Sequence, residues 1–144
     1  MRPVRPLLTG PVRGGILFIA MKVSEEKARL FLEKKEREKD LRLDERFERA
    51  RRNFEAIRRM IVERYRPRRI YQWGSLLDRS RFRDYSDIDI AVEGVDEPER
   101  FFQMFGEAEK LSDLPLDLID INRIEPEFAE LIKEKGVVVY ERED

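Results

Sequence analysis

The sequence predicts an α/β protein of the α+β type that begins with a long N-terminal helix. Three observations support this fold class. A chain of 144 residues is long enough to bury one ordinary core and too short for two. Segments with helical and strand periodicity follow one another in the order helix, strand, strand, helix, strand, helix, strand. The charged residues, 42% of the chain, gather in the predicted helices and loops, whereas the predicted strands are short and mostly apolar.

The first predicted helix runs from Ser24 to about Tyr65. Ser24 is suited to the N-cap, with Glu25 and Glu26 in the first turn, where the helix dipole favours acidic side chains. Residues 33–40, EKKEREKD, contain no apolar residue and therefore predict a solvated arm. Beyond this arm, apolar residues recur at steps of three and four, which indicates one buried helical face: Leu43, Phe47, Ala50, Phe54, Ile57, Ile61 and Tyr65. The chain thus divides into an expected disordered tail (1–23), a charged helical arm (24–42) and a folded domain (43–144).

The remaining elements are shorter and are bounded by proline and glycine. Pro67 ends the first helix, and Pro126 and Gly136 begin and end the last one. The predicted strands cover residues 70–73, 87–92, 116–121 and 137–140, and the other helices cover 98–111 and 126–135.

The composition excludes several kinds of chemistry. The chain has no cysteine and no histidine, which removes disulfides, thiol nucleophiles, histidine bases and nearly all zinc and haem sites. Catalysis would have to use carboxylates, hydroxyls, Lys, Arg and metal ions held by oxygen. The absence of cysteine fits a cytoplasmic protein. The apolar run of residues 16–20 is far shorter than the roughly 20 residues of a membrane span, so no membrane association is expected.

Charge is distributed unevenly along the chain. Residues 1–84 contain 24 Lys and Arg against 13 Asp and Glu, a net charge of +11, and residues 85–144 contain 6 against 18, a net charge of -12. A basic half is therefore followed by an acidic half.

Two aspartates interrupt the apolar strand of residues 87–92. Because side chains alternate between the two faces of a strand, Asp87 and Asp89 project together while Ile88 and Ile90 project to the other face. Neighbouring carboxylates repel each other unless positive charge lies between them. An isolated Asp-x-Asp most often meets water, so its meaning depends on what accompanies it.

Two further features accompany this pair. Gly74-Ser75 ends the preceding strand, where the glycine permits a tight turn and the serine can offer a hydroxyl and N–H groups to a phosphate if a helix begins at Leu76. Asp117 lies within the apolar strand 116–121 and would place a third carboxylate beside the first two if the strands are neighbours. Asp120 faces the opposite way by alternation. Together these residues predict a site for metal ions and a phosphate-containing substrate.

This arrangement resembles the nucleotidyltransferase fold of the DNA polymerase β superfamily: a strand ending in Gly74-Ser75, the Asp87-Ile88-Asp89 pattern, and Asp117 in a later strand. The span from about residue 47 to 140 resembles the minimal nucleotidyltransferases (MNT), the antitoxins of HEPN/MNT toxin–antitoxin pairs. The resemblance implies a small mixed β-sheet flanked by helices.

The resemblance also implies the roles of the site residues. Asp87, Asp89 and Asp117 would be catalytic and would hold two Mg²⁺ ions, as in two-metal phosphoryl transfer. Asp117 would also accept the proton of the attacking hydroxyl. The ATP substrate would bind at Gly74, Ser75, Arg79 and Ser86. The loop departs from the family pattern, in which an arginine and a glycine often follow Gly-Ser, because here the arginine comes only at Arg79 and Ser80 replaces the glycine.

A protein partner follows from the same resemblance. Only residues 118–144 come after the third aspartate, so the acceptor is expected to be presented by another protein. In HEPN/MNT pairs the acceptor is a tyrosine of the HEPN toxin, an RNase, which is silenced by AMPylation. The resemblance therefore implies a hetero-oligomer with a HEPN-type toxin.

Three other interpretations remain at this stage. The chain could transfer a nucleotide to a small molecule, or could be an antitoxin that acts by binding only and keeps a vestigial site. A nucleic-acid module is not expected, because the arginines of the first helix are interleaved with glutamates, as on a solvated, salt-bridged face: Arg49, Arg51, Arg52, Arg58 and Arg59.

Overall fold

Helix α1 is the longest element of the protein. The computed structural model describes residues 11–143, with side chains from residue 21 onward, and α1 spans Pro11–Tyr65. The helix therefore begins well before Ser24, the residue that the sequence indicated as its N-cap. Residues 1–10 of the expected tail lie outside the described residues, and residues 11–23 belong to α1. The chain divides into two units, Met1–Leu41 and Arg42–Asp144.

The side chains of residues 21–41, in the first unit, face solvent. All of them are exposed except that of Glu38, and they include Leu30, Phe31 and Leu32. Local contacts run along the helix, such as the ion pair between Arg29 and Glu33 at 3.8 Å. No helix in the described part of the chain is both long enough and apolar enough to cross a membrane.

The second unit is built on a mixed four-stranded sheet. Its strands are β1 (Arg69–Trp73), β2 (Ile88–Glu93), β3 (Leu116–Asp120) and β4 (Val137–Glu141), in the spatial order β3-β2-β1-β4. β1 pairs antiparallel with both β2 and β4, and β2 pairs parallel with β3. These bounds and the mixed sheet confirm the predicted fold class, with each strand within two residues of its expected limits.

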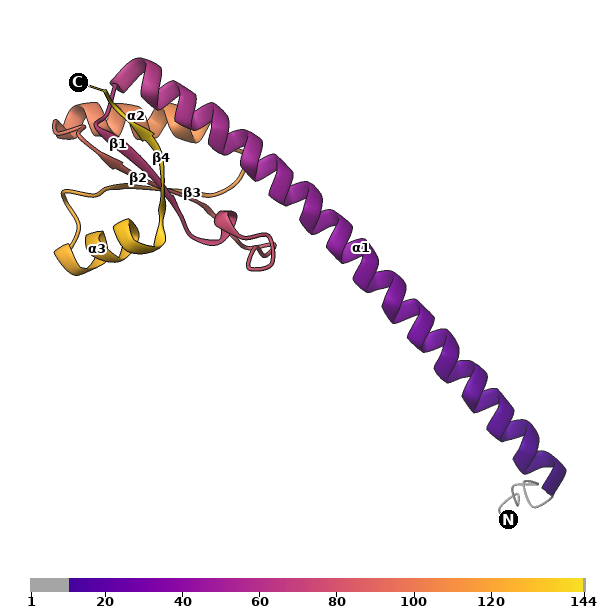
Figure 1. The fold of residues 1–144 in the computed structure, drawn as a ribbon. Coiled ribbons are helices and arrows are strands. Elements are labelled where there is room, and N and C mark those ends of the chain that lie inside the picture. The colour runs from indigo at the N-terminus through magenta and orange to yellow at the C-terminus, as the bar shows by residue number, and fades with distance from the viewer. Residues whose placement is uncertain (1–10, 144) are drawn as a thin grey trace, which may run out of the picture. The chain divides into compact units, whose positions relative to one another are not determined.

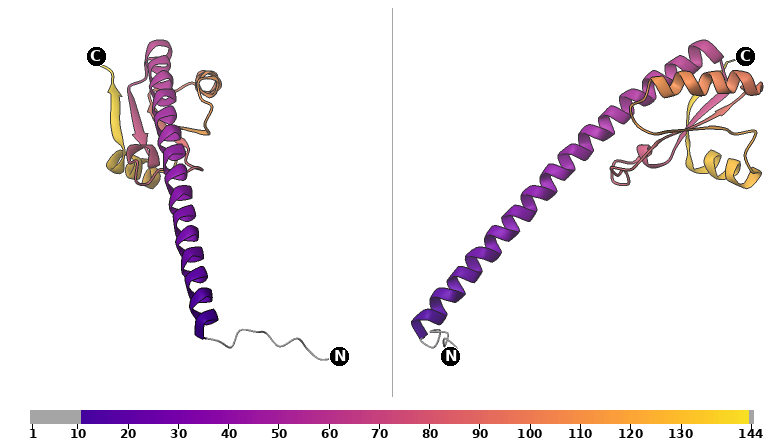
Figure 2. Two further views of the ribbon diagram at one scale, coloured as in Figure 1. Left: turned by 90° about the vertical axis from the view of Figure 1, so that its right-hand side faces the viewer. Right: turned by 180° about the vertical axis from the view of Figure 1, so that it is seen from behind.

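Helices cover both faces of this sheet (Figure 1). The C-terminal part of α1 and helix α2 (Pro98–Lys110) lie on one face, and helix α3 (Pro126–Lys135) lies on the other. The two further views in Figure 2 show the same layers. The faces of β2 differ accordingly, since Ile88, Ile90 and Val92 belong to the α1/α2 side and Ala91 to the α3 side.

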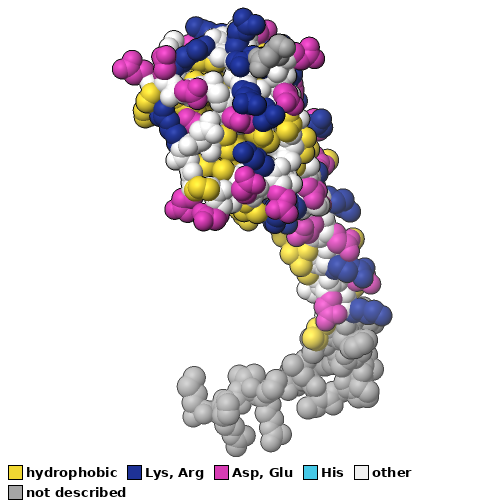
Figure 3. Space-filling model, turned by 60° about the vertical axis from the view of Figure 1, so that its left-hand side comes forward, with side chains coloured by type: hydrophobic (Ala, Val, Ile, Leu, Met, Phe, Trp, Pro, Cys, Tyr) yellow, Lys and Arg dark blue, Asp and Glu magenta, His cyan; other side chains and the backbone are white. Residues whose placement is uncertain are grey.

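The two halves of the charge distribution come together in the folded domain. Among the described residues, ion pairs that join the basic half to the acidic half include Arg49 with Asp113, Arg64 with Glu107, and Arg69 with both Glu93 and Glu141. On the face of this domain seen in Figure 3, basic and acidic side chains alternate, with hydrophobic side chains between them. Ion pairs between the two halves thus occur beside pairs formed within one half, such as Arg79 with Asp44.

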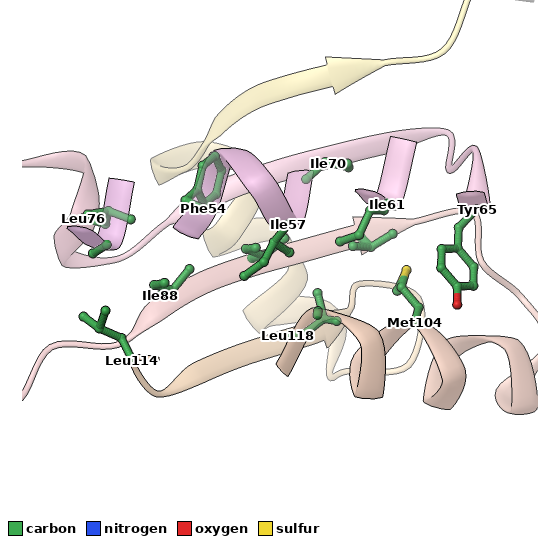
Figure 4. Packing of buried hydrophobic residues seen from close by; sticks show 14 of the residues in the cluster. Phe54, Ile57, Ile61, Tyr65, Ile70, Leu76, Ile88, Met104, Leu114 and Leu118 are labelled. Carbon is green, nitrogen blue, oxygen red and sulfur yellow. The ribbon is translucent and has the colours of Figure 1, made fainter. Parts of the chain in front are cut away.

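The larger core lies between the sheet and helices α1 and α2. Phe54, Ile57 and Ile61 of α1 meet Ile88 of β2 and Met104 of α2 (Figure 4). The smaller core packs α3, through Ala129 and Ile132, against the opposite face. Burying apolar area on both faces fixes the strand alternation, because a slip by one residue would move every core side chain to the wrong face.

Candidate active site

Asp89 lies on the α3 side of the sheet, near the N-terminal end of β2. In the strand register it lies opposite Trp73 of β1 and opposite Asp117 of β3. Side chains in register on adjacent strands project from the same face, so Asp89 and Asp117 lie side by side. Asp87 comes one residue before β2 begins, and alternation directs it to the same face as Asp89. The three aspartates singled out from the sequence are therefore brought together.

The aspartates influence one another electrostatically. Burial raises the pKa of Asp89 to about 7, and the charges of Asp117 and Asp87 add to this effect. The pKa of Asp117 is also raised, first by burial and then by the charge of Asp87. A cation bound between these carboxylates would relieve their mutual repulsion.

Gly74 is fixed in place by the Asp89 carboxylate. Its φ angle is 81°, in the left-handed region that favours glycine. A Cβ atom built on Gly74 would lie 2.1 Å from Oδ2 of Asp89, well inside any allowed contact. The carboxylate therefore packs directly against the backbone of the turn, and only glycine allows this approach.

A single helical turn follows Gly74. Residues Ser75–Leu77 form the 3₁₀ turn η1, in which the N–H of Leu77 donates to the carbonyl of Gly74 at 3.3 Å. Leu76 is buried and anchors the turn in the core. The condition set for phosphate binding, a helix that begins at Leu76, is thus met by only a single 3₁₀ turn.

Residues 78–86 form an ordered loop that joins η1 to Asp87. At its start, the Asp78 carboxylate accepts hydrogen bonds from the backbone N–H and the hydroxyl of Ser80, at 3.0 and 2.7 Å, and these bonds lower its pKa. In its middle, the ring of Phe82 is fully buried. Ser80, which stands where the family pattern has glycine, therefore closes the turn with its own side chain.

The other two predicted nucleotide ligands lie in this loop. The Nε of Arg79 donates to Oδ1 of Asp44, on α1, at 2.6 Å. Ser86 is buried, and its hydroxyl accepts a hydrogen bond from the backbone N–H of Arg83 at 2.8 Å. Ser86 thus shapes the turn immediately before Asp87, whereas Arg79 is held from α1.

The chemistry of the donors fits a divalent cation held by oxygen. Asp87, Asp89 and Asp117 offer only carboxylate oxygens, the ligands that Mg²⁺ prefers in proteins. Among the side chains described here, however, no three acidic groups already converge in a geometry that could hold a metal ion. The carboxylates would need to turn toward a common point when a cation binds.

The structure adds residues that the sequence did not single out. Asp44 and Arg46 of α1 contact the loop, although 35 and 40 residues separate them from their partners Arg79 and Ser86. Trp73, the only tryptophan of the chain, lies beside Asp89 in the register. Its position directly before Gly74 was the one signal in the sequence that could have identified it.

Comparison with known proteins agrees with this geometry. The family model described as "Polymerase beta, Nucleotidyltransferase" matches residues 55–144, more than half of the chain. The matched span contains all four strands and every site residue predicted from the sequence. None of the curated proteins matches the chain.

Proposed function

This chain belongs to the polymerase β nucleotidyltransferase family, and on that premise we propose that it is a metal-dependent enzyme that transfers AMP from ATP to a tyrosine hydroxyl of a partner protein. The observation that supports this proposal is the grouping of Asp87, Asp89 and Asp117 on one face of the sheet, with Asp89 against Gly74. Nucleotidyl transfer needs carboxylates at such a place, because they would hold the divalent cations that neutralise the negative charge of the triphosphate.

The proposed reaction is an in-line displacement at the α-phosphorus of ATP. The acceptor hydroxyl oxygen forms a bond to this phosphorus, the bond from the phosphorus to the bridging oxygen breaks, and pyrophosphate leaves with the electron pair. Asp117 accepts the hydroxyl proton. Divalent cations held by the three carboxylates would neutralise the charge that develops on the phosphate oxygens. The backbone at Gly74 and Ser75, together with Arg79, would bind the triphosphate.

The proposed acceptor is a tyrosine of a HEPN-type RNase toxin, and the two proteins would form a hetero-oligomer. The residue pattern and the span of the chain that resembles the minimal nucleotidyltransferases support this choice. Under this proposal the protein is an antitoxin that silences its partner by AMPylation. The alternative is an antitoxin that inhibits its partner by contact alone and does not modify it.

The first experiment tests binding of nucleotide and metal. Mg²⁺ with ATP should raise the melting temperature, since a ligand that binds only the folded state stabilises it, and should change the fluorescence of Trp73. The double variant Asp87→Asn/Asp89→Asn should lose both responses. Asp84→Asn, an exposed aspartate of the same loop, is the matched control and should keep both. Equal responses in all three proteins would show that metal and nucleotide bind at a different place.

The second experiment tests the reaction. Incubation with ATP, Mg²⁺ and a HEPN-type RNase as the proposed partner should add the mass of AMP to the toxin, release pyrophosphate and abolish RNase activity. Asp87→Asn, Asp89→Asn and Asp117→Asn should each lower the rate by about 10³-fold or more, because they remove charge from the site. An unmodified toxin that is inhibited equally by the wild type and by Asp87→Asn would establish the antitoxin that acts by binding only.

A further inference from the structure

We propose that Asp44 of α1 is a positioning residue for nucleotide binding: it holds Arg79, and with it the loop of residues 78–86, where the arginine can meet the triphosphate. This inference rests on the proposed function. It assigns a role in the nucleotide site to a helix residue that lies outside the strand and loop motif, and outside the matched span of residues 55–144.

Three contacts from one short stretch of α1 hold the loop. Near the start of the loop, Asp44 accepts a hydrogen bond from the Nε of Arg79 at 2.6 Å. In the middle, Phe47 packs edge-to-face against Phe82, with ring centroids 5.2 Å apart. At the end, Nη2 of Arg46 donates to the carbonyl of Ser86 at 3.3 Å. The loop is therefore fixed along its whole length by a single turn of helix.

The loop joins the two halves of the candidate active site. Gly74 and Ser75 precede it and Asp87 follows it, so a displacement of the loop would move the phosphate-binding turn relative to the first carboxylate. Arg79 has a long side chain that loses much rotamer freedom when it is ordered. A carboxylate that fixes its Nε orders the guanidinium before the substrate arrives, which lowers the entropic cost of binding phosphate.

The solvent exposure of the ion pair between Asp44 and Arg79 indicates that it contributes little to folding stability. The side chains of Arg79 and Asp44 are 33% and 58% exposed. Ion pairs with such exposure contribute about 0–1 kcal/mol to folding. Phe82, in contrast, is fully buried, so its replacement would disturb the core. The ion pair of Asp44 can therefore be removed at little cost to folding, whereas the Phe82 contact cannot.

The test compares Asp44→Asn with the matched control Asp113→Asn. Asp113 also faces α1, where it accepts a hydrogen bond from Asn53 and pairs with Arg49, but it lies in the connection between α2 and β3. Hydrogen exchange of the loop amides and the affinity for ATP with Mg²⁺ are measured in each protein. We expect Asp44→Asn to speed exchange in residues 78–86 and to weaken ATP binding about tenfold, the usual scale for a residue that orients a ligand group. Asp113→Asn should change neither the exchange of the loop amides nor the affinity for ATP. The melting temperatures of the two variants should stay within a few degrees of the wild type.

A charge exchange then distinguishes positioning from a purely structural ion pair. The double variant Asp44→Arg/Arg79→Asp keeps the pair and should restore slow exchange in the loop, but it should not restore ATP binding, because the arginine no longer comes from the loop. Restored binding would overturn the assignment, as would an Asp44→Asn variant with unchanged exchange and unchanged affinity. If the wild-type protein binds no nucleotide, the proposed function and the role of Asp44 in nucleotide binding are both wrong. The hydrogen-exchange data would still decide whether Asp44 orders the loop.

Discussion

Gly74 connects the strand, the turn and the carboxylate of the candidate site. Replacement by alanine places a Cβ atom 2.1 Å from Oδ2 of Asp89 and forces a side chain into a φ of 81°. We expect Gly74→Ala to lose about 2–4 kcal/mol of unfolding free energy, from strain and from displacement of Asp89. Urea denaturation measures this loss, and an unchanged midpoint would show that the turn can relax.

Gly106 provides the control for this substitution. It lies within α2, and an added Cβ would meet no heavy atom within 4 Å apart from its chain neighbours and the nearby backbone of its own helix. Gly106→Ala should therefore stabilise the protein by about 0.5–1 kcal/mol, because alanine loses less backbone entropy in a helix than glycine does. If Gly74→Ala lowers the free energy of unfolding and Gly106→Ala raises it, the local geometry rather than the residue type determines the effect of the substitution.

At this scale the sequence predicted that three aspartates lie close together, but not which residues hold the loop beside them. Alternation along the strands placed Asp89 and Asp117 correctly, because a period of two needs no tertiary information. Asp44 could not be found in this way, because its contact with Arg79 depends on how α1 packs against the core. A contact across many residues leaves no local pattern in either segment.

The end of α1 is fastened to α2 by Tyr65. Its hydroxyl donates to Oε2 of Glu107 at 2.7 Å, and burial, followed by the bond to Glu107, raises the pKa of Tyr65 to about 12. In the unfolded chain a tyrosine titrates near 10. The neutral hydroxyl therefore stabilises the fold fully below about pH 10, and this contribution is lost as the pH rises toward 12.

Tyr65→Phe should therefore cost about 1.5–3 kcal/mol of unfolding free energy at pH 8, as expected for a hydrogen bond to a charged group. The difference from the wild type should stay constant up to about pH 10 and then shrink. Urea denaturation from pH 8 to pH 11.5 measures it. A difference that widens above pH 10 would contradict the direction of the pKa shift.

The elements were largely predictable because each carries its own local signal. Pro98, Pro126 and Gly136 mark the ends of α2 and α3, and the β-branched and aromatic residues mark the strands. The start of α1 was predicted wrongly at Ser24. A good N-cap residue followed by two glutamates signals a helix start, but such a signal does not stop a helix that already runs through it from Pro11. Boundaries of this kind depend on the neighbouring segment as well as on the cap.

Across the whole molecule, the opposite charges of the two halves are brought together by folding. Arg49, Arg64 and Arg69 come from the basic half, and their acidic partners come from the half after residue 84. These pairs are partly exposed, and each contributes little to stability. Acidic and basic side chains also pair within each half, as Arg58 does with Glu55. The pairs between the halves therefore add to the contact of α1 with α2 and of β1 with its neighbours but do not determine it.

The division of the chain at residues 41 and 42 leads to the last prediction. Among residues 21–143, every buried apolar side chain comes after residue 42, the first being Ala50. Deletion of residues 1–41 should therefore leave a domain that unfolds cooperatively, with a melting temperature within about 5 °C of the full chain, because the apolar area buried on folding is retained. Deletion of residues 1–50 is the control: it also removes Leu43, Phe47 and Ala50 from the core and takes away Asp44, so it should lower the melting temperature sharply or abolish the transition. Thermal and urea unfolding followed by circular dichroism distinguish these outcomes. A broad, non-cooperative transition in the shorter deletion would show that the N-terminal part of α1 supports the fold.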